Sequence, residues 1–463
     1  MRSSPLPHRA LPRRHRQSPG DPVSGGAFRC DRLGPRRVHH GRTSGIHGGR
    51  RHDRSPNPGG LPSTNTHHLA SNGHDDVKQV DARHPAVVVI GGGPAGAAVA
   101  IACGELGHDV ELLERDRFPR AKVCGCCLAD RGVEALRRFG LHDLVDEGIP
   151  LHSVGVGCRG RHVELPFHGS VVISRETLDT ALVEHAVRRG TRLRTRVRAH
   201  VDHTGVVHAT DLETGENFER HPQVIVVADG LEGRALDEHP DFTWRVSNRS
   251  RFGAGLSIDP GMSAEEAPPP GRLTMLAGRG GYLGLVRLPD GRLDLAAAID
   301  REVARGEGGP AGIAARLLQE DGRNGLAEMV SKERWRGTPR LTRSRRVASG
   351  NIACIGDAAG YVEPFTGEGM SWAIGGAHRL AQLVDQAIVH GRSLDAWRHL
   401  HRRATWWDRL RCRSIALAVR HPGTAHAMLR SAARLPILGS RLADTASGAT
   451  SNHGGTLAIG GKG

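Results

Sequence analysis

Three glycines and one acid near residue 91 form a pattern that could bind a nucleotide. The run Gly91-x-Gly93-x-x-Gly96 follows the apolar stretch Ala86–Ile90, and Glu114 closes the next apolar run. Glycines at this spacing allow a tight turn, a close approach of the backbone to a diphosphate, and a helix N-terminus directed at it. A carboxylate at the end of the second strand can accept hydrogen bonds from ribose hydroxyls. These residues predict a dinucleotide site.

A second acid follows another buried stretch late in the chain. The predicted strand Val347–Ile355 runs into Gly356 and Asp357, and a helical pattern begins near Gly369. An acid held after a strand can accept hydrogen bonds from a polyol, and a helix N-terminus stabilises negative charge on a bound ring. The alternative is that Asp357 only caps a helix.

A parallel sheet is the element that would position both acids. We predict a strand over Ala86–Ile90, a helix over Ala95–Leu106 and a strand over Asp109–Glu114, which is the repeating unit of a doubly wound sheet. An amphipathic helix over Arg175–Arg189 and a buried strand over Val224–Val227 continue the pattern.

The middle of the chain has a different character. Three strands are predicted over Leu273–Leu276, Tyr282–Leu288 and Arg292–Ile299, with a hairpin turn at Pro289–Gly291. Such an antiparallel sheet can form a wall over a ligand. Residues 394–442 have a largely helical pattern.

Charge is concentrated at the start of the chain. Residues 1–84 contain 14 Arg and one Lys against 6 Asp, so they hold +9 of the total +15. This segment has no helical or strand period and cannot bury enough apolar surface to fold. We predict a disordered arm, or a start site that is annotated too early. Because 60 of the 64 basic residues are Arg, codon usage is an alternative to selection for nucleic-acid binding.

The number of cysteines and the lengths of the apolar segments indicate in which cellular compartment the protein is expected. Eight cysteines in 463 residues are too few for a disulfide scaffold, and only Cys124, Cys126 and Cys127 are clustered. Three sulfurs without a matching pair downstream do not predict a metal site, although a redox-active thiol beside Lys122 is an alternative. With no apolar segment long enough to span a membrane and no secretion signal, we expect a cytoplasmic protein.

Taken together, the motifs resemble the FAD-dependent oxidoreductases of the p-hydroxybenzoate hydroxylase superfamily, and within it the geranylgeranyl-reductase-like branch, over residues 86–447. The resemblance implies that the glycine motif binds the ADP half of FAD, that Asp229-Gly230 lies near FAD and the NAD(P)H site, and that Asp357 holds the ribityl chain. The residues it assigns to cofactor binding are Gly91, Gly93, Pro94, Ala95, Gly96, Glu114, Arg115, Lys122, Cys124, Gly125, Arg175, Asp229, Gly230, Gly356, Asp357, Pro364, Gly367 and Gly369.

The sequence departs from the family on the substrate sheet. In the run from Gly280 to Arg287, Tyr282 is retained, but Gly284 replaces an aromatic residue and no proline follows. This argues against halogenation and against geranylgeranyl substrates. Tyr282 and Cys124 are the candidate proton donors, and no metal is expected.

The resemblance implies an α/β (α+β) fold with a Rossmann-like FAD-binding domain, an antiparallel substrate-binding sheet and C-terminal helices. The predicted ranges are an arm over 1–84, the FAD-binding domain over 85–240 and 346–390, the substrate sheet over 241–345, C-terminal helices over 391–447 and a flexible tail over 448–463.

The implied function is an FAD-dependent oxidoreductase reduced by NAD(P)H that hydroxylates or reduces a small hydrophobic metabolite, such as a polyketide or isoprenoid product. The alternatives are a prenyl double-bond reductase and, remotely, a protein that binds nucleic acid through its basic arm.

Overall fold

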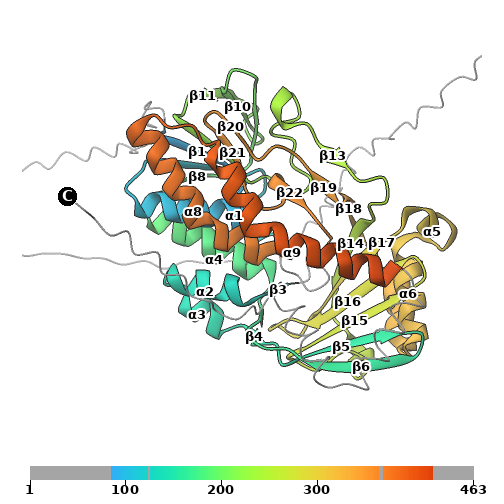
Figure 1. The fold of residues 1–463 in the computed structure, drawn as a ribbon. Coiled ribbons are helices and arrows are strands. Elements are labelled where there is room, and N and C mark those ends of the chain that lie inside the picture. The colour runs from blue at the N-terminus through green and yellow to red at the C-terminus, as the bar shows by residue number, and fades with distance from the viewer. Residues whose placement is uncertain (1–84, 124–125, 364–368, 421–463) are drawn as a thin grey trace, which may run out of the picture. The chain divides into compact units, whose positions relative to one another are not determined.

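The computed structural model describes residues 85–123, 126–363 and 369–420 (Figure 1). All of them belong to a compact unit that comprises residues 79–463. The predicted arm over 1–84, the tail over 448–463 and the C-terminal part of the predicted helical segment lie outside the described residues.

A six-stranded sheet, in the order β20-β21-β12-β1-β2-β8, forms the centre of the first core. The pairs β21·β12, β12·β1, β1·β2 and β2·β8 are parallel, so the carboxyl ends of these strands meet at one edge. The strands are β1 Val87–Ile90, β2 Val110–Leu113, β8 Arg192–Arg194, β12 Val224–Val227, β20 Ala348–Ser349 and β21 Ile352–Cys354.

Helices and a small sheet complete this core. Helix α1 (Pro94–Glu105) packs against both α4 (Arg175–Arg188) and α8 (Gly369–His390), and Figure 1 shows the three helices side by side. The meander β9 (Val197–Val201), β10 (Val207–Asp211) and β11 (Asn217–Arg220) adds apolar residues to the same core. Every side chain of β1 and β12 is buried, as expected of strands covered on both faces.

A seven-stranded sheet, in the order β18-β14-β17-β16-β15-β5-β6, forms the second core. It is antiparallel except for the pair β15·β5. Its strands are β5 Ser153–Cys158, β6 Arg161–Pro166, β14 Phe252–Ile258, β15 Arg272–Gly278, β16 Gly281–Arg287, β17 Leu293–Ile299 and β18 Arg336–Arg340.

The two faces of this sheet bury different partners. Alternate residues such as Leu283 and Leu285 pack against residues of α5 (Arg301–Gly306), α6 (Gly309–Glu320) and α7 (Asn324–Lys332). The side chains that alternate with them along β16, Tyr282 and Val286, belong to a separate apolar cluster with Cys126 and Cys127. We call this second group the inner-face cluster.

Two further three-stranded sheets, three 3-10 turns and three helices complete the described residues. They are β3 Cys127–Leu128, α2 Asp130–Arg138, α3 His142–Asp146, β4 Ile149–Pro150, β7 Val171–Val172, β13 Arg245–Val246, β19 Arg343–Ser344, β22 Gly360–Tyr361, the 3-10 turns η1 Pro240–Phe242, η2 Gly261–Ser263 and η3 Gly356–Ala359, and the long helix α9 Ala396–Arg420. None of the helices within the described ranges is long and apolar enough to cross a membrane.

One predicted strand is wrong in a way that matters for the site. The stretch Val347–Ile355 is not continuous, because Gly350 has a φ of +59° and turns the chain between β20 and β21. The two short strands pair antiparallel, with Ala348 opposite Ala353. Only β21 therefore points toward the edge where Asp357 lies.

Candidate active site

The glycine turn joins β1 to α1 and leaves no room for side chains at two positions. Gly91 has a φ of +104°, and a Cβ there would lie 2.5 Å from the carbonyl oxygen of Ala228. A Cβ on Gly96 would lie 1.9 Å from the carbonyl oxygen of Gly91. Pro94 opens α1, and Gly93 is its N-cap without a side chain to bond the first amides. The N-terminus of α1 thus presents unbonded N–H groups and a positive dipole to a ligand.

Glu114 fixes this turn from the neighbouring strand. Its carboxylate, almost fully buried, accepts a hydrogen bond from the amide of Gly92 at 2.7 Å through Oε2. Its Oε1 accepts hydrogen bonds from the amide of Asp116 at 2.9 Å and from Arg120 Nη1 at 3.0 Å. Within the protein, Glu114 therefore already fixes the glycine turn and orients Arg120, in addition to its predicted role toward a ribose.

Two guanidinium groups lie over the glycine turn. A Cβ on Gly93 would be 3.6 Å from Arg120 Nη2 and 3.9 Å from Arg175 Nη2. Arg175 makes two hydrogen bonds of 2.8 Å to Asp179, which is buried, and Arg120 Nη2 lies 3.4 Å from the same carboxylate. Arg120 Nε is buried without a hydrogen-bond partner in the described part of the chain. This donor set suits the charge of a diphosphate above the turn.

The remaining basic residues of the first motif are less central. Lys122 Nζ bonds Asp116 Oδ2 at 3.0 Å, while Arg115 is half exposed and lies 3.6 Å from the same carboxylate. Partial burial alone would raise the pKa of Asp116, but the hydrogen bond and charge of Lys122 outweigh burial and lower it. Gly255 of β14 lies against Val123, so this segment passes the second sheet. Cys124 and Gly125 lie outside the described residues.

Asp229 follows β12 at the same edge of the sheet. Its Oδ2 accepts a hydrogen bond of 2.9 Å from the amide of Ala235, whereas its Oδ1 has no hydrogen-bond partner within the described ranges and lies 3.8 Å from Arg345 Nη2. Burial raises the pKa of Asp229, and the charge of Arg345 only partly opposes that rise. Gly230 has a φ of +79°, and a Cβ on Gly233 would overlap the Asp229 carboxylate, which explains the Gly at this position.

Gly356 and Asp357 approach the glycine turn from β21. Gly356 has a φ of +63°, and its Cβ would lie 2.8 Å from Cβ of Ala95, the second residue of α1. A Cβ on Gly369 would be 3.7 Å from Asp357 Oδ1 and 3.8 Å from Cε2 of Tyr361. Asp357 therefore lies beside the N-terminus of α8. Pro364 and Gly367 lie outside the described residues.

Tyr282 lies on the second sheet, in the inner-face cluster that also includes Tyr361. Arg251 lies 5.6 Å from the centre of its ring, and Arg251 Nη1 donates a hydrogen bond of 2.9 Å to Glu363. Burial raises the pKa of Tyr282 well above its usual value, with Glu363 adding to the rise. The phenol is therefore protonated at neutral pH.

Three predicted groups thus converge on one edge, and one residue was missed. The glycine turn and the start of α1 lie within contact distance of both the Asp229 loop and the Gly356-Asp357 turn. Arg120 was not predicted as a site residue. Its position six residues after Glu114 is the sequence signal that could have indicated an ion pair between the two. That these residues bind FAD stays a prediction. The glycine cradle fits that cofactor, as does the buried Arg120 Nε, which has no hydrogen-bond partner among the described residues.

Comparison with known proteins agrees with this geometry. Residues 84–243 match the FAD binding domain family. A menaquinone reductase of Mycolicibacterium smegmatis is 28% identical over 339 residues, which are 67% of this chain and 78% of that protein. A kynurenine 3-monooxygenase of Xanthomonas oryzae is 29% identical over 339 residues, covering 65% of this chain and 71% of that protein.

Solved structures show the same fold. A flavoprotein/dehydrogenase from Cytophaga hutchinsonii superposes with a TM-score of 0.67 at 18% identity, covering 79% of this chain and 93% of that one. PqsL of Pseudomonas aeruginosa, a probable FAD-dependent monooxygenase, superposes with a TM-score of 0.57 at 21% identity, covering 74% and 98%. The predicted fold class and the predicted class of enzyme, an FAD-dependent oxidoreductase, are confirmed at this level.

Proposed function

We propose that the protein binds FAD at the carboxyl edge of the parallel sheet, is reduced by NAD(P)H, and acts on a small hydrophobic metabolite. The observation that carries the proposal is the placement of two guanidinium groups, Arg120 and Arg175, within 4 Å of a Cβ position on Gly93. They supply positive charge where a helix N-terminus already favours a diphosphate. Bound FAD would supply hydride transfer or oxygen activation, and the protein orients the substrate.

The inner-face cluster is the candidate substrate wall. It is mainly aliphatic, and Tyr361 connects it to Asp357 and to the start of α8. An isoprenoid or polyketide could pack against such a surface, and exclusion of water there would protect reactive species.

Reduction of a carbon–carbon double bond is the half-reaction that Tyr282 favours. Saturation adds a hydride to one carbon and a proton to the other. Tyr282 carries a phenol proton within the inner-face cluster, which we assign to the substrate. Because burial raises its pKa, this phenol is a weak acid that would release its proton only to a strongly basic carbon, such as one left by hydride transfer. The similarity to a menaquinone reductase supports a reduction, whereas the similarity to a kynurenine 3-monooxygenase supports hydroxylation as the alternative.

The test is spectroscopic and then chemical. We expect the purified full chain to bind FAD, to bleach with NADPH or NADH without oxygen, and to add two hydrogens to menaquinone with an unsaturated side chain. A product heavier by one oxygen atom would favour hydroxylation instead. A protein that fails to take up FAD would overturn the proposal.

The variant Tyr282→Phe separates the two half-reactions. If Tyr282 delivers the proton, turnover should fall on the order of 100-fold while the flavin spectrum and its reduction by NAD(P)H stay unchanged. The control is Phe252→Tyr on β14, which β17 separates from the strand of Tyr282, and it should leave both steps unchanged. Unchanged turnover in Tyr282→Phe would remove Tyr282 from the mechanism.

A further inference from the structure

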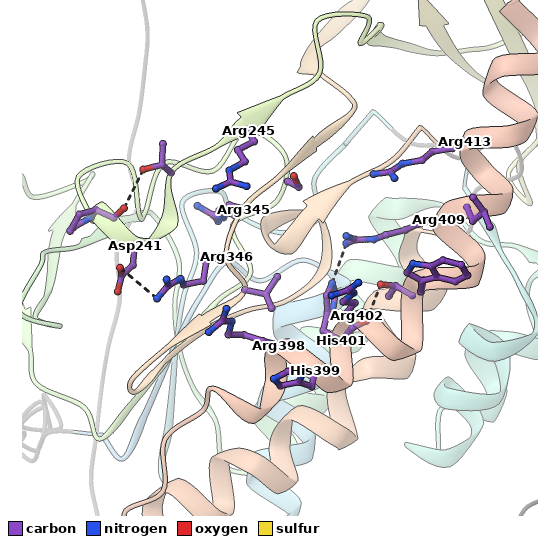
Figure 2. Close-up of a pocket in the computed structure, with 17 residues that line it drawn as sticks. Asp241, Arg245, Arg345, Arg346, Arg398, His399, His401, Arg402, Arg409 and Arg413 are labelled. Atoms are coloured by element: carbon purple, nitrogen blue, oxygen red, sulfur yellow. Dashed lines mark hydrogen bonds and ion pairs between the residues drawn. The ribbon is translucent and has the colours of Figure 1, made fainter.

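A cavity of about 920 Å³ opens beside α9, and no residue of the glycine turn is among those that line it. Figure 2 shows the residues around this cavity. Its walls come from α9, from the segment between η1 and β13, and from the chain between β19 and β20. Seven arginines and two histidines line it against a single acid, Asp241; the basic lining residues are Arg245, Arg345, Arg346, Arg398, Arg402, Arg409, Arg413, His399 and His401. We call this the arginine cavity.

Carboxylates of the described residues offset only part of this charge. Arg346 lies 3.6 Å from Asp241 and Arg345 lies 3.8 Å from Asp229, and the other five arginines form no ion pair with a carboxylate in the described ranges. The described carboxylates therefore leave most of this positive charge uncompensated, and an anionic ligand would stabilise it.

Arg345 is the strongest sign of a built site. Its side chain is fully buried, and its Nε donates a hydrogen bond of 2.6 Å to the carbonyl oxygen of Ala358. Its Nη1 and Nη2 have no hydrogen-bond partner among the described residues, although the guanidinium lies 4.2 Å from the centre of the Trp244 ring. A buried N–H donor without an acceptor costs free energy, because folding removes its hydrogen bonds to water. A ligand acceptor in the cavity would replace those hydrogen bonds.

His401 and Arg409 form the inner wall of the cavity. Arg409 Nη2 lies 3.1 Å from His401 Nε2, and Arg409 Nε is buried without a partner within the described ranges. Burial, together with the charge of Arg409, lowers the pKa of His401 to about 3, so the imidazole is neutral and accepts this hydrogen bond. Burial and the charge of Arg413 lower the pKa of Arg409, which shows that the cations repel one another.

We propose that the arginine cavity binds a ligand that carries two or more phosphate groups. One phosphate can be matched by two or three arginines, and the fork of donors in a guanidinium fits phosphate oxygens in pairs. The cavity volume is within the range of sites that hold whole small molecules, so it can take more than inorganic phosphate. Trp406 lines the cavity and is 45% exposed, and its ring offers a surface for a flat or apolar part of the ligand.

The cavity is separate from the glycine turn but touches the candidate active site through Arg345. This residue contacts Ala358 in η3 and lies near Asp229, and both follow strands of the parallel sheet. A phosphorylated ligand would therefore bind behind the loops that we assign to the flavin. The proposal does not depend on which substrate the flavin acts on.

Calorimetric titration of the FAD-saturated full chain with inorganic pyrophosphate tests the proposal. Saturation with FAD keeps pyrophosphate from the glycine turn, and the flavin spectrum reports FAD binding separately. At constant ionic strength we expect pyrophosphate to bind at least about tenfold more tightly than orthophosphate, because more arginines engage.

Matched variants locate the binding. The double variant Arg398→Gln with Arg402→Gln should weaken pyrophosphate binding at least about tenfold while FAD binding stays unchanged. Arg403→Gln, on the same helix but outside the cavity lining, is the control and should bind as the parent does. Absence of pyrophosphate binding, or an equal loss in the control, would overturn the proposal. Competition by ADP, NADPH or farnesyl diphosphate would then identify the source of the phosphates.

Discussion

Arg120 connects the two acids that surround the glycine turn. It bonds Glu114 at 3.0 Å and lies 3.4 Å from Oδ2 of Asp179, the same oxygen that accepts a hydrogen bond of 2.8 Å from Arg175 Nη2. Both guanidinium groups are oriented by carboxylates and are almost buried, so little side-chain freedom remains to be lost when an anion binds. Pre-orientation of this kind makes the affinity for a diphosphate sensitive to the acids as well as to the arginines.

Removal of one negative charge behind Arg120 should weaken FAD binding. In Glu114→Gln the amide oxygen can still accept from Gly92, but the ion pair with Arg120 is lost and the ribose loses a charged acceptor. We expect the Kd for FAD to rise about tenfold, or about 1.4 kcal/mol, in a fluorescence titration. Glu213→Gln breaks the exposed ion pair with Arg117 and is the control. Equal affinities in all three proteins would contradict the role of Glu114.

His401 should make stability depend on pH. Because its pKa falls to about 3 in the folded protein from 6.5, the unfolded chain binds more protons between these values. Stability therefore rises with pH in this window and is lost as pH falls from 6.5, by up to about 1.4 kcal/mol per pH unit. Urea unfolding from pH 7 to pH 5 should show a smaller loss for His401→Gln than for the parent. The matched substitution is His399→Gln, at an exposed neighbour on the same helix.

At the scale of elements, the glycines of the turn between β1 and α1 have two different roles. Some are required by close packing within the protein, whereas one leaves space for a ligand. A Cβ on Gly96 would overlap the carbonyl oxygen of Gly91, whereas a Cβ on Gly93 meets nothing closer than 3.6 Å. Gly96→Ala should thus lower the free energy of unfolding by about 1–3 kcal/mol through overpacking. Gly93→Ala should leave apoprotein stability nearly unchanged but weaken FAD binding, because the methyl group projects toward the arginines.

Thermal unfolding of the apoproteins and FAD titration measure the two effects independently. Gly337→Ala in β18 is the control, since a Cβ there meets nothing within 4 Å. If Gly93→Ala lost stability and FAD affinity together, the turn would be structural throughout and the assignment of Gly93 to the cofactor would fail.

Elements with a strong local signal could be predicted from the sequence. The buried strand Val224–Val227 and the helix from Gly369 to His390 have the predicted bounds, because continuous β-branched residues and a helical apolar period each identify one structure. The antiparallel run β15-β16-β17 was predicted for the same reason, with the turn at Pro289–Gly291 confirmed by the bond from the amide of Leu288 to the carbonyl of Arg292.

Features that depend on distant contacts could not be predicted. Strand β5 pairs parallel with β15, although more than a hundred residues separate the two strands along the chain. The amino-acid pattern of either strand does not indicate its partner. The predicted domain ranges stay predictions, since β5 and β6 come from the stretch assigned to the FAD-binding domain but pair within the other sheet. Arg120 and the arginine cavity were missed because arginine is abundant throughout the chain and charge alone does not show which residues meet.

At the scale of the whole molecule, every described residue of the candidate active site and of the arginine cavity belongs to the compact unit over residues 79–463. The unit contains the parallel sheet, the second sheet and α9. Residues 1–78 fall in the other unit. Because the residues that we assign to both sites lie in the second unit, we expect the flavin chemistry to be separable from the basic arm.

A chain shortened to residues 79–463 tests this separation. We expect it to bind FAD and pyrophosphate with the affinities of the full chain, because the residues that hold both anions remain and the deleted segment adds only diffuse positive charge, which salt screens. Titrations at two salt concentrations measure this, and circular dichroism checks that the shortened chain is folded. A folded but flavin-free product would mean that the arm completes the cofactor site. If instead the full chain bound DNA in a salt-dependent manner and the shortened chain did not, the arm would be a nucleic-acid binding segment joined to the enzyme.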